Sequence, residues 1–250
     1  MIYVYAIIDA CAQTPPDVPG VEGLPVLVRR STGVSVIFSE VSRPDVEPSA
    51  QTLWQHEAVV EAVMREGDAV LPIRFGMTIH GEAALDEIVA RHRHALEHGL
   101  TRVRGCVEMG LRVTPRQAQP AAASPAAAAA AHSTSAAAAS RSGLEYMLAR
   151  LEDERRRRAS QSRADALREL IDGALSPLSR EHTHRLLPAP TVLLTAAYLV
   201  PRERVESFAS GARALSSECS EARVTCTGPW APYHFVPALA SARAAEVAHG

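Results

Sequence analysis

Lysine is absent from this 250-residue chain, and aromatic residues make up only 4% of it. All 26 residues in the combined lysine and arginine count are therefore arginine. We interpret this as a compositional bias towards Arg, Ala and Pro, not as a signal for phosphate binding. The formal net charge is −2, so the sequence does not indicate a basic surface of the kind that binds nucleic acid.

Paired cysteines and long apolar runs are also missing. The four cysteines, Cys11, Cys106, Cys219 and Cys226, form no CxxC motif, so neither a zinc site nor a thioredoxin-type motif is indicated. No secretory signal is recognisable, and we expect free thiols in a reducing cytoplasm. The nearest candidate for a membrane helix, residues 191–200, has about half the required length, so no membrane partner is expected.

Motifs of common enzyme classes are absent too: the chain has no GxSxG, P-loop, GxGxxG or HExxH. His94 and His98 are spaced i,i+4 on a predicted helix, and two such histidines can grip zinc. Without further ligands at a matching spacing, we interpret them as exposed helix histidines. His182 and His184 likewise give no sufficient indication of a metal site. The sequence therefore predicts no catalytic residue, no metal site, no cofactor and no enzyme activity.

Residues 1–99 show strand and helix patterns in the order βββαβα. Strands are expected at 2–8, 24–29, 33–40 and 69–75, and helices at 52–66 and 81–98. The alternation within 33–40 favours burial of one face. Ser49 or Thr52 caps the first helix, Leu53 opens its apolar stripe, and Gly99 ends the second helix. Pro72 indicates that the strand at 69–75 lies at a sheet edge or contains a bulge.

Residues 100–237 follow the order βαββαβ, a ferredoxin-like arrangement. Strands are expected at 101–113, 185–187, 191–200 and 222–227, and helices from 142 to about 170 and at 201–217. An Ala/Pro-rich insertion at about 114–141 is expected to be flexible and partly helical, and 238–250 form a tail. The predicted fold class is therefore α+β with two small domains, 1–99 and 100–237, that share a close boundary near Gly99.

The long helix from residue 142 has apolar residues at both ends and a charged middle. Its first stripe is expected to pack and consists of Leu144, Met147, Leu148 and Leu151. In the middle, acidic residues precede arginines by four positions, which stabilises a helix in solvent. The run Arg155–Arg158 either binds an acidic partner or forms a solvated helix face, and the pattern favours the solvated face.

The segment 227–236, TGPWAPYHFV, concentrates two prolines and three aromatic residues in ten positions. Proline fixes φ and cannot donate to a strand ladder, so a plain strand or helix is excluded. We expect the end of a strand followed by a rigid aromatic strap. The strap either closes the core or forms a lip that binds a partner, and the pattern favours closure of the core.

Two stretches, AVLPIRFG at 69–76 and TGPWAPYHFV at 227–236, resemble the gas vesicle protein family GvpL/GvpF. That family has an LP-x-RFG segment and closes with tGPWPPYsFV. Here Ala231 replaces the usual proline, and His234 replaces a small polar residue. The stretches YVYAII, RGCVEMGLRV and AAYLVPRERVESF support the resemblance, which covers nearly the whole chain apart from residues 115–141.

The resemblance implies an accessory protein of gas vesicle assembly that acts in the cytoplasm or on the vesicle and is not an enzyme. Its implied partners are the hydrophobic shell protein GvpA and other gas vesicle accessory proteins, with no nucleic acid and no membrane. The fold it implies is two α+β domains, the second a modified ferredoxin-like one. The alternatives are a small-molecule-binding regulatory module and an enzyme of heme or metal chemistry, both argued from fold analogy alone.

Partner contacts are predicted at the two stretches that carry the resemblance. The candidate residues are Arg74, Phe75, Trp230, Tyr233 and Phe235. An apolar shell subunit aggregates unless its exposed strands are covered, and a sheet edge with aromatic pockets could cover it. Arg74 is either an interfacial ion-pair donor or a bridge between the domains.

Overall fold

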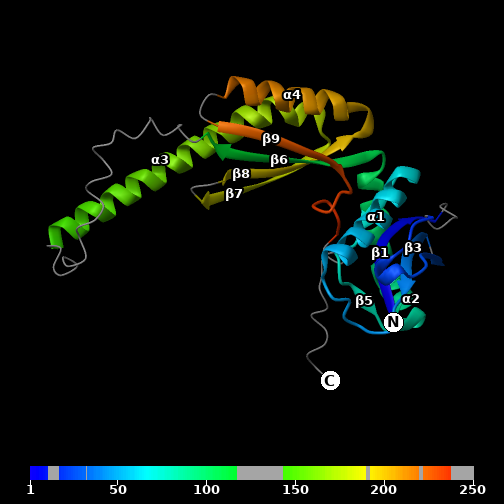
Figure 1. Ribbon diagram of the computed structural model, residues 1–250. Helices are drawn as coiled ribbons and strands as arrows, with labels where there is room; N and C mark the ends of the chain where they lie inside the picture. Colours follow the sequence, from blue (N-terminus) through cyan, green and yellow to red (C-terminus); the bar gives the residue numbers. More distant parts are fainter. Residues whose placement is uncertain (11–16, 32, 117–142, 190–191, 220–221, 238–250) are drawn as a thin grey trace.

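The computed structural model describes residues 1–10, 17–31, 33–116, 143–189, 192–219 and 222–237. The chain is an α+β protein with two antiparallel sheets, which lie at either side of a narrow junction, and one long helix that projects from the second sheet (Figure 1). No described helix has both the length and the apolar character needed to cross a bilayer.

The first sheet is built around a central strand, β1 (Ile2–Asp9). Its neighbours are β3 (Val34–Glu40), β4 (Val70–Pro72) and β5 (Thr78–Ile79), and β2 (Leu27–Ser31) completes the order β2-β3-β1-β4. The prediction that the segment around Pro72 is an edge strand is confirmed, although only three of its residues are in the strand. The predicted strand at 24–29 starts and ends later, because it pairs with β3 from Leu27 onward.

One helix covers each face of this sheet. Helix α1 (Ala50–Glu66) packs on the face that contains Tyr3, Tyr5 and Ile37. Helix α2 (Gly81–Val103) packs on the other face, against Val4 and Val36. Residues 34–39 are consequently buried on both faces, and the prediction that only one face of this strand is buried is wrong.

At the start of α1, the sequence predicts the helix cap correctly but not which side chains are buried. Ser49 accepts a hydrogen bond from the Thr52 amide, and the Thr52 hydroxyl accepts one from the Ser49 amide, which makes a reciprocal capping box. The two residues predicted as alternative caps therefore act together. Leu53, predicted to be buried, is 44% exposed, and His56 is buried instead. The apolar pattern misplaced the start of the buried stripe of α1, because the residue that faces the core there is a histidine.

Helix α2 continues through Gly99, where the sequence predicted its end. A Cβ at Gly99 would lie 3.0 Å from Pro237 Cγ and 3.2 Å from Leu71 Cδ1, so glycine is needed here for close packing, not for termination. The helix ends at Val103, and Gly105 turns the chain at a φ of +67° into the next strand. That strand starts at Cys106, five residues later than predicted.

The second sheet has the order β7-β8-β6-β9 and is antiparallel throughout. Its strands are β6 (Cys106–Pro115), β7 (Glu181–Ala189), β8 (Val192–Pro201) and β9 (Ala222–Trp230). Helices α3 (Gly143–Leu175) and α4 (Val205–Glu218) share a core with one face of it. Short 3-10 turns lie at Val21–Gly23, Ser176–Leu178 and Arg202–Arg204. The predicted element order from β6 to β9 is confirmed.

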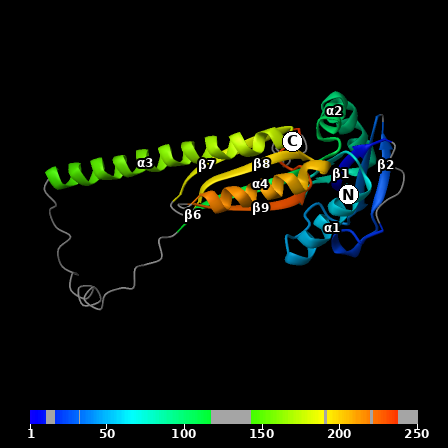
Figure 2. The same ribbon diagram turned by 90° about the horizontal axis from the view of Figure 1, so that it is seen from above.

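Helix α3 extends well beyond the sheet in both views (Figures 1 and 2). Among its described side chains, those that are buried belong to the C-terminal half: Ala164, Ile171 and Leu175. Met147, Leu148 and Leu151 are exposed, so the prediction that the first apolar stripe packs is wrong for these three residues. Arg158 pairs with Glu154 at 2.9 Å, as the i,i+4 spacing suggested. The side chains described in the arginine run are exposed, and its role stays a prediction.

Arginines join the two sheets across the junction. Arg104 pairs with Asp9 of β1, and Arg202 donates to the carbonyl oxygens of Met64 and Gly67 at the end of α1. Arg102 near the end of α2 pairs with Glu181 of β7. The division into domains at residues 99 and 100 stays a prediction. Most of the insertion at 114–141, the tail at 238–250 and Cys11 lie outside the described residues, whereas Cys106, Cys219 and Cys226 are free thiols.

Replacing Leu100 by Ala is expected to lower the free energy of unfolding by about 2–5 kcal/mol, because Leu100 is buried where both sheets contribute to one core. The matched Leu53→Ala change should alter it by about 0.5 kcal/mol or less, since that side chain is mostly exposed. Urea denaturation of both variants measures the difference. Equal losses would contradict this assignment of core and surface.

Candidate functional site

The two segments that carry the family resemblance, 69–76 and 227–236, converge on one buried histidine. His56, on α1, has its Nε2 3.0 Å from the carbonyl oxygen of Ile73 and 3.5 Å from the hydroxyl of Tyr233. The Phe75 ring lies edge-on to the His56 ring, with centroids 5.7 Å apart. Segments more than 150 positions apart in the chain therefore share one contact point.

The hydrogen bonds around His56 define its protonation state. A carbonyl oxygen can only accept, so Nε2 carries the proton and donates to Ile73. The other nitrogen, Nδ1, lies 2.9 Å from the Tyr3 hydroxyl oxygen and accepts a hydrogen bond from that hydroxyl. The Tyr3 oxygen in turn accepts from the Gly76 amide at 3.1 Å. This chain of donors and acceptors is complete with a neutral imidazole.

Burial lowers the pKa of His56 to about 4, although its bond to the Ile73 carbonyl opposes the shift. Burial also raises the pKa of Tyr3 well above its ordinary value. Both side chains are therefore uncharged near neutral pH. An uncharged and fully hydrogen-bonded network suits a structural junction, because it avoids the cost of a buried charge.

The strap begins where β9 ends. Strand β9 pairs with β6 as far as Trp230, opposite Glu108, which is three residues further than predicted. Gly228 has a φ of +117°, and a Cβ there would lie 2.8 Å from the Glu108 carbonyl oxygen. Glycine is required at this position by both the conformation and the close approach of the neighbouring backbone.

Glu108 holds the strap from the second sheet. Its side chain is buried and accepts hydrogen bonds from the His234 amide, at 2.9 Å, and from His234 Nδ1, at 2.7 Å. The backbone bond is open to any non-proline residue, whereas the side-chain bond needs a donor such as histidine. His234, which departs from the family pattern, therefore adds a second contact to a buried carboxylate.

Tyr233 and Phe235 attach the strap to the first sheet. The Tyr233 hydroxyl donates to Glu57 Oε1 at 2.9 Å, and burial raises the pKa of this tyrosine, with Glu57 adding to the shift. Phe235 is 2% exposed and lies in a core cluster with residues of both sheets. The Arg102 guanidinium lies 5.7 Å from its ring centroid.

The remaining candidates lie at the surface. Trp230 is 54% exposed, although the two residues after it are buried. Arg74 is exposed and forms no ion pair with the described residues, and Phe75 is half-buried. The structure thus brings Phe75 and Tyr233 together around His56, places Phe235 in the core, and leaves Trp230 and Arg74 accessible to solvent.

Sequence reasoning missed three residues of this region. His56 gave no signal because a single histidine in an amphipathic helix is usually exposed, and Glu108 gave none because a lone carboxylate in a strand usually faces solvent. Trp54 on α1 is 75% exposed, three residues before Glu57. Trp54 had a signal, since it is one of only two tryptophans in the chain.

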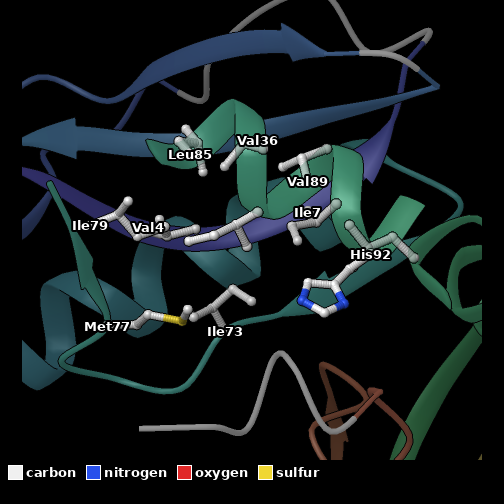
Figure 3. Close-up of a pocket in the computed structure, with 11 residues that line it drawn as sticks. Val4, Ile7, Val36, Ile73, Met77, Ile79, Leu85, Val89 and His92 are labelled. Carbon is white, nitrogen blue, oxygen red and sulfur yellow. The ribbon is translucent and has the colours of Figure 1, made fainter. Parts of the chain in front are cut away.

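A small apolar cavity lies between β1, β3 and α2 (Figure 3). Its volume is about 30 Å³, and it is lined by Val4, Ile7, Val36, Ile73, Met77, Ile79, Leu85, Ile88, Val89, His92 and Leu96. That is room for about two water molecules. The cavity does not favour the small-molecule alternative, because an organic ligand would not fit without rearrangement.

The helix histidines do not form a ligand set. His94 is almost fully exposed, and its Nδ1 lies 3.9 Å from Glu97 Oε2. The group of potential metal ligands found among the described residues lies elsewhere, on the second sheet and α3: Asp172, His182 and His184.

Comparisons with known proteins identify the family that the two segments resemble. The family model described as "Gas vesicle synthesis protein GvpL/GvpF" matches residues 1–237. Gas vesicle protein F of Haloferax mediterranei is 25% identical over 239 residues, with 94% of this chain and 92% of that protein covered. Gas vesicle protein L of Streptomyces sp. (strain CB03234) is 30% identical over 200 residues, with 76% and 71% covered.

Solved structures show the same fold. The crystal structure of the gas vesicle protein GvpF from Anabaena sp. PCC7120 superposes with a TM-score of 0.72 at 20% identity, covering 94% of this chain and 95% of that one. The GvpF structure from Microcystis aeruginosa gives a TM-score of 0.70, also at 20% identity, covering 94% and 98%.

Acidification from pH 6.5 to pH 4 is expected to remove about 3 kcal/mol of stability through His56. Its pKa is about 4 when folded against an ordinary value of 6.5, so the unfolded chain binds the proton more readily in this window. The contribution is present above pH 6.5 and lost as the pH falls to 4. Urea denaturation of the wild type and His56→Gln across this range isolates it, since other groups titrate in both. Identical pH dependence would refute the assignment.

Gly228→Ala is expected to destabilise the protein by about 2–4 kcal/mol, from the backbone conformation and from crowding against Glu108. The control is Gly173→Ala in α3, where no neighbouring atom lies within 4 Å of the added carbon. That change should be neutral or stabilising by up to about 1 kcal/mol. Thermal unfolding compares the two, and equal effects would contradict the role of Gly228.

Proposed function

Because the chain belongs to the gas vesicle synthesis protein GvpL/GvpF family, we propose that it binds the hydrophobic shell protein GvpA and assists its assembly. Family membership makes it a protein of gas vesicle formation, in a family not known for enzymes. The binding of GvpA is the further step of this proposal. We infer that its second sheet and helices form the modified ferredoxin-like unit that the resemblance implied.

The observation that carries the proposal is the exposed Trp230 next to a rigidly held strap. Trp230 is largely open to solvent, while Ala231, Pro232 and Phe235 are buried. A large aromatic side chain on a fixed backbone is a typical anchor in protein interfaces, because little conformational entropy is lost on binding. An apolar partner such as a shell subunit would cover it.

The candidate residues would divide into contacts and supports. Trp230 and Arg74 are exposed and would touch the partner, and the half-buried Phe75 and Tyr233 would line the contact. Phe235 would hold the strap from inside. The chain would bind GvpA mainly through these side chains and less by pairing a strand of GvpA with β4.

The backbone of β4 is the reason for that preference. Pro72 has no amide hydrogen, the Ile73 amide donates to the Tyr5 carbonyl, and the Ile73 carbonyl accepts from His56. Few backbone groups are therefore free to pair with an added strand, and side-chain contacts must supply the affinity.

The place of action follows from the partner. We propose that the chain works in the cytoplasm at the growing gas vesicle, with GvpA and other gas vesicle accessory proteins. Nucleic acid and membrane have no part in this function.

Trp230→Ala in the full chain is expected to weaken capture of GvpA by tenfold or more, since loss of an interface anchor costs about 2 kcal/mol. Arg74→Ala should weaken it less, because a solvated charge contributes little. Pull-down with tagged GvpA measures the effect, with circular dichroism to verify folding.

The matched control is Tyr146→Ala, an exposed aromatic residue near the far end of α3 (Figure 1). It should leave capture unchanged. A folded Trp230→Ala variant that captures GvpA as well as the wild type does would refute the proposed surface.

A further inference from the structure

A cluster of potential metal ligands lies where α3 meets the edge strand β7. His182 and His184 are two positions apart on β7, so their side chains project from the same face of the strand. That face is covered by the C-terminal half of α3, which contributes Asp172. One ligand atom from each of the three residues lies within 4.8 Å of the other two.

The contacts within the cluster are close. His184 Nε2 lies 2.8 Å from Asp172 Oδ1, and the two imidazole rings have centroids 4.8 Å apart. Ser176 Oγ lies 3.4 Å from His182 Nδ1. Two imidazoles and one carboxylate are therefore gathered within 4.8 Å. Two ligands of one tetrahedral zinc ion are about 3.3 Å apart, so small side-chain rotations would bring all three to a single ion.

We propose that Asp172, His182 and His184 bind one divalent transition-metal ion, of which Zn²⁺ is the best fit. Zinc accepts histidine nitrogen and carboxylate oxygen, and three protein ligands leave a fourth tetrahedral position for water. Calcium and magnesium prefer sites made of oxygen alone, so two imidazoles select against them. The bound ion would fasten the projecting helix α3 to the edge of the sheet.

Tyr198 supports this assignment because its hydroxyl contacts two of the three proposed ligands. Its buried hydroxyl donates to Asp172 Oδ1 at 3.2 Å and lies 3.3 Å from His184 Nε2. Hydrogen bonds of this kind orient ligating carboxylates and tune metal affinity. The Tyr198 ring, on β8, also packs against the rings of His182 and Phe208 and so helps to hold His182 in place.

The surroundings of the cluster also suit an ion. A neutral imidazole is the form that binds a metal, and binding releases any proton that the ligand carries. His182 is exposed, which leaves a path for entry. The positive charge of Arg168 opposes the binding of a cation. Its Nε is buried without a hydrogen-bond partner among the described residues. The guanidinium would therefore favour an anion or hydroxide in the fourth position.

The test is a titration of the full chain, first stripped with EDTA, with Zn²⁺ by isothermal calorimetry. We expect one equivalent to bind and the melting temperature to rise with added Zn²⁺. His182→Ala and His184→Ala should each lower the affinity tenfold or more. Tyr198→Phe removes only the hydroxyl and should lower it by about tenfold, an effect that loss of packing alone would not produce.

The matched control is the double variant His94→Ala/His98→Ala, which removes the exposed helix pair and should bind Zn²⁺ as the wild type does. The proposal is overturned if the wild type binds less than one equivalent. It is equally overturned if the folded His182→Ala/His184→Ala variant keeps its affinity, or if the helix variant loses it. Because His182 is exposed, its single variant is expected to fold and keeps the test decisive.

Discussion

The buried imidazole of His56 is the contact on which the junction of this protein depends. It donates to the Ile73 carbonyl and accepts from Tyr3, while Phe75 and Tyr233 pack around it. An unpaired polar group at this depth would cost several kcal/mol. The two segments that carry the resemblance must therefore keep their positions relative to each other.

This constraint explains how an exposed tryptophan can be held firmly. Glu108 binds the strap from the second sheet through His234, and Tyr233 binds it to α1 through Glu57. Trp230 is the last residue of β9 that pairs with β6, and these attachments follow within five residues of it. An exposed aromatic side chain beside a fixed backbone is typical of interface anchors, and this is why we propose Trp230 as a partner contact.

The long helix α3, unlike the strap, projects from the rest of the protein (Figure 1). The side chains described as buried lie in its C-terminal half, and its charged middle is supported by pairs such as Glu154–Arg158. The proposed metal site lies near the C-terminal end of α3, where the helix touches the edge strand β7. An ion there would secure the position from which the rest of α3 projects.

Local sequence determined the elements, their order and the family, because apolar periodicity, capping residues and short motifs act over a few neighbouring positions. The capping box at Ser49, the edge position of Pro72 and the β6-to-β9 order were all predictable in this way. Tertiary structure alone decided that Leu53 and Met147 are exposed, that Phe235 is buried, and that His182 and His184 meet Asp172. Those outcomes depend on which surfaces meet after folding, and contacts between distant segments leave no period or spacing in the sequence.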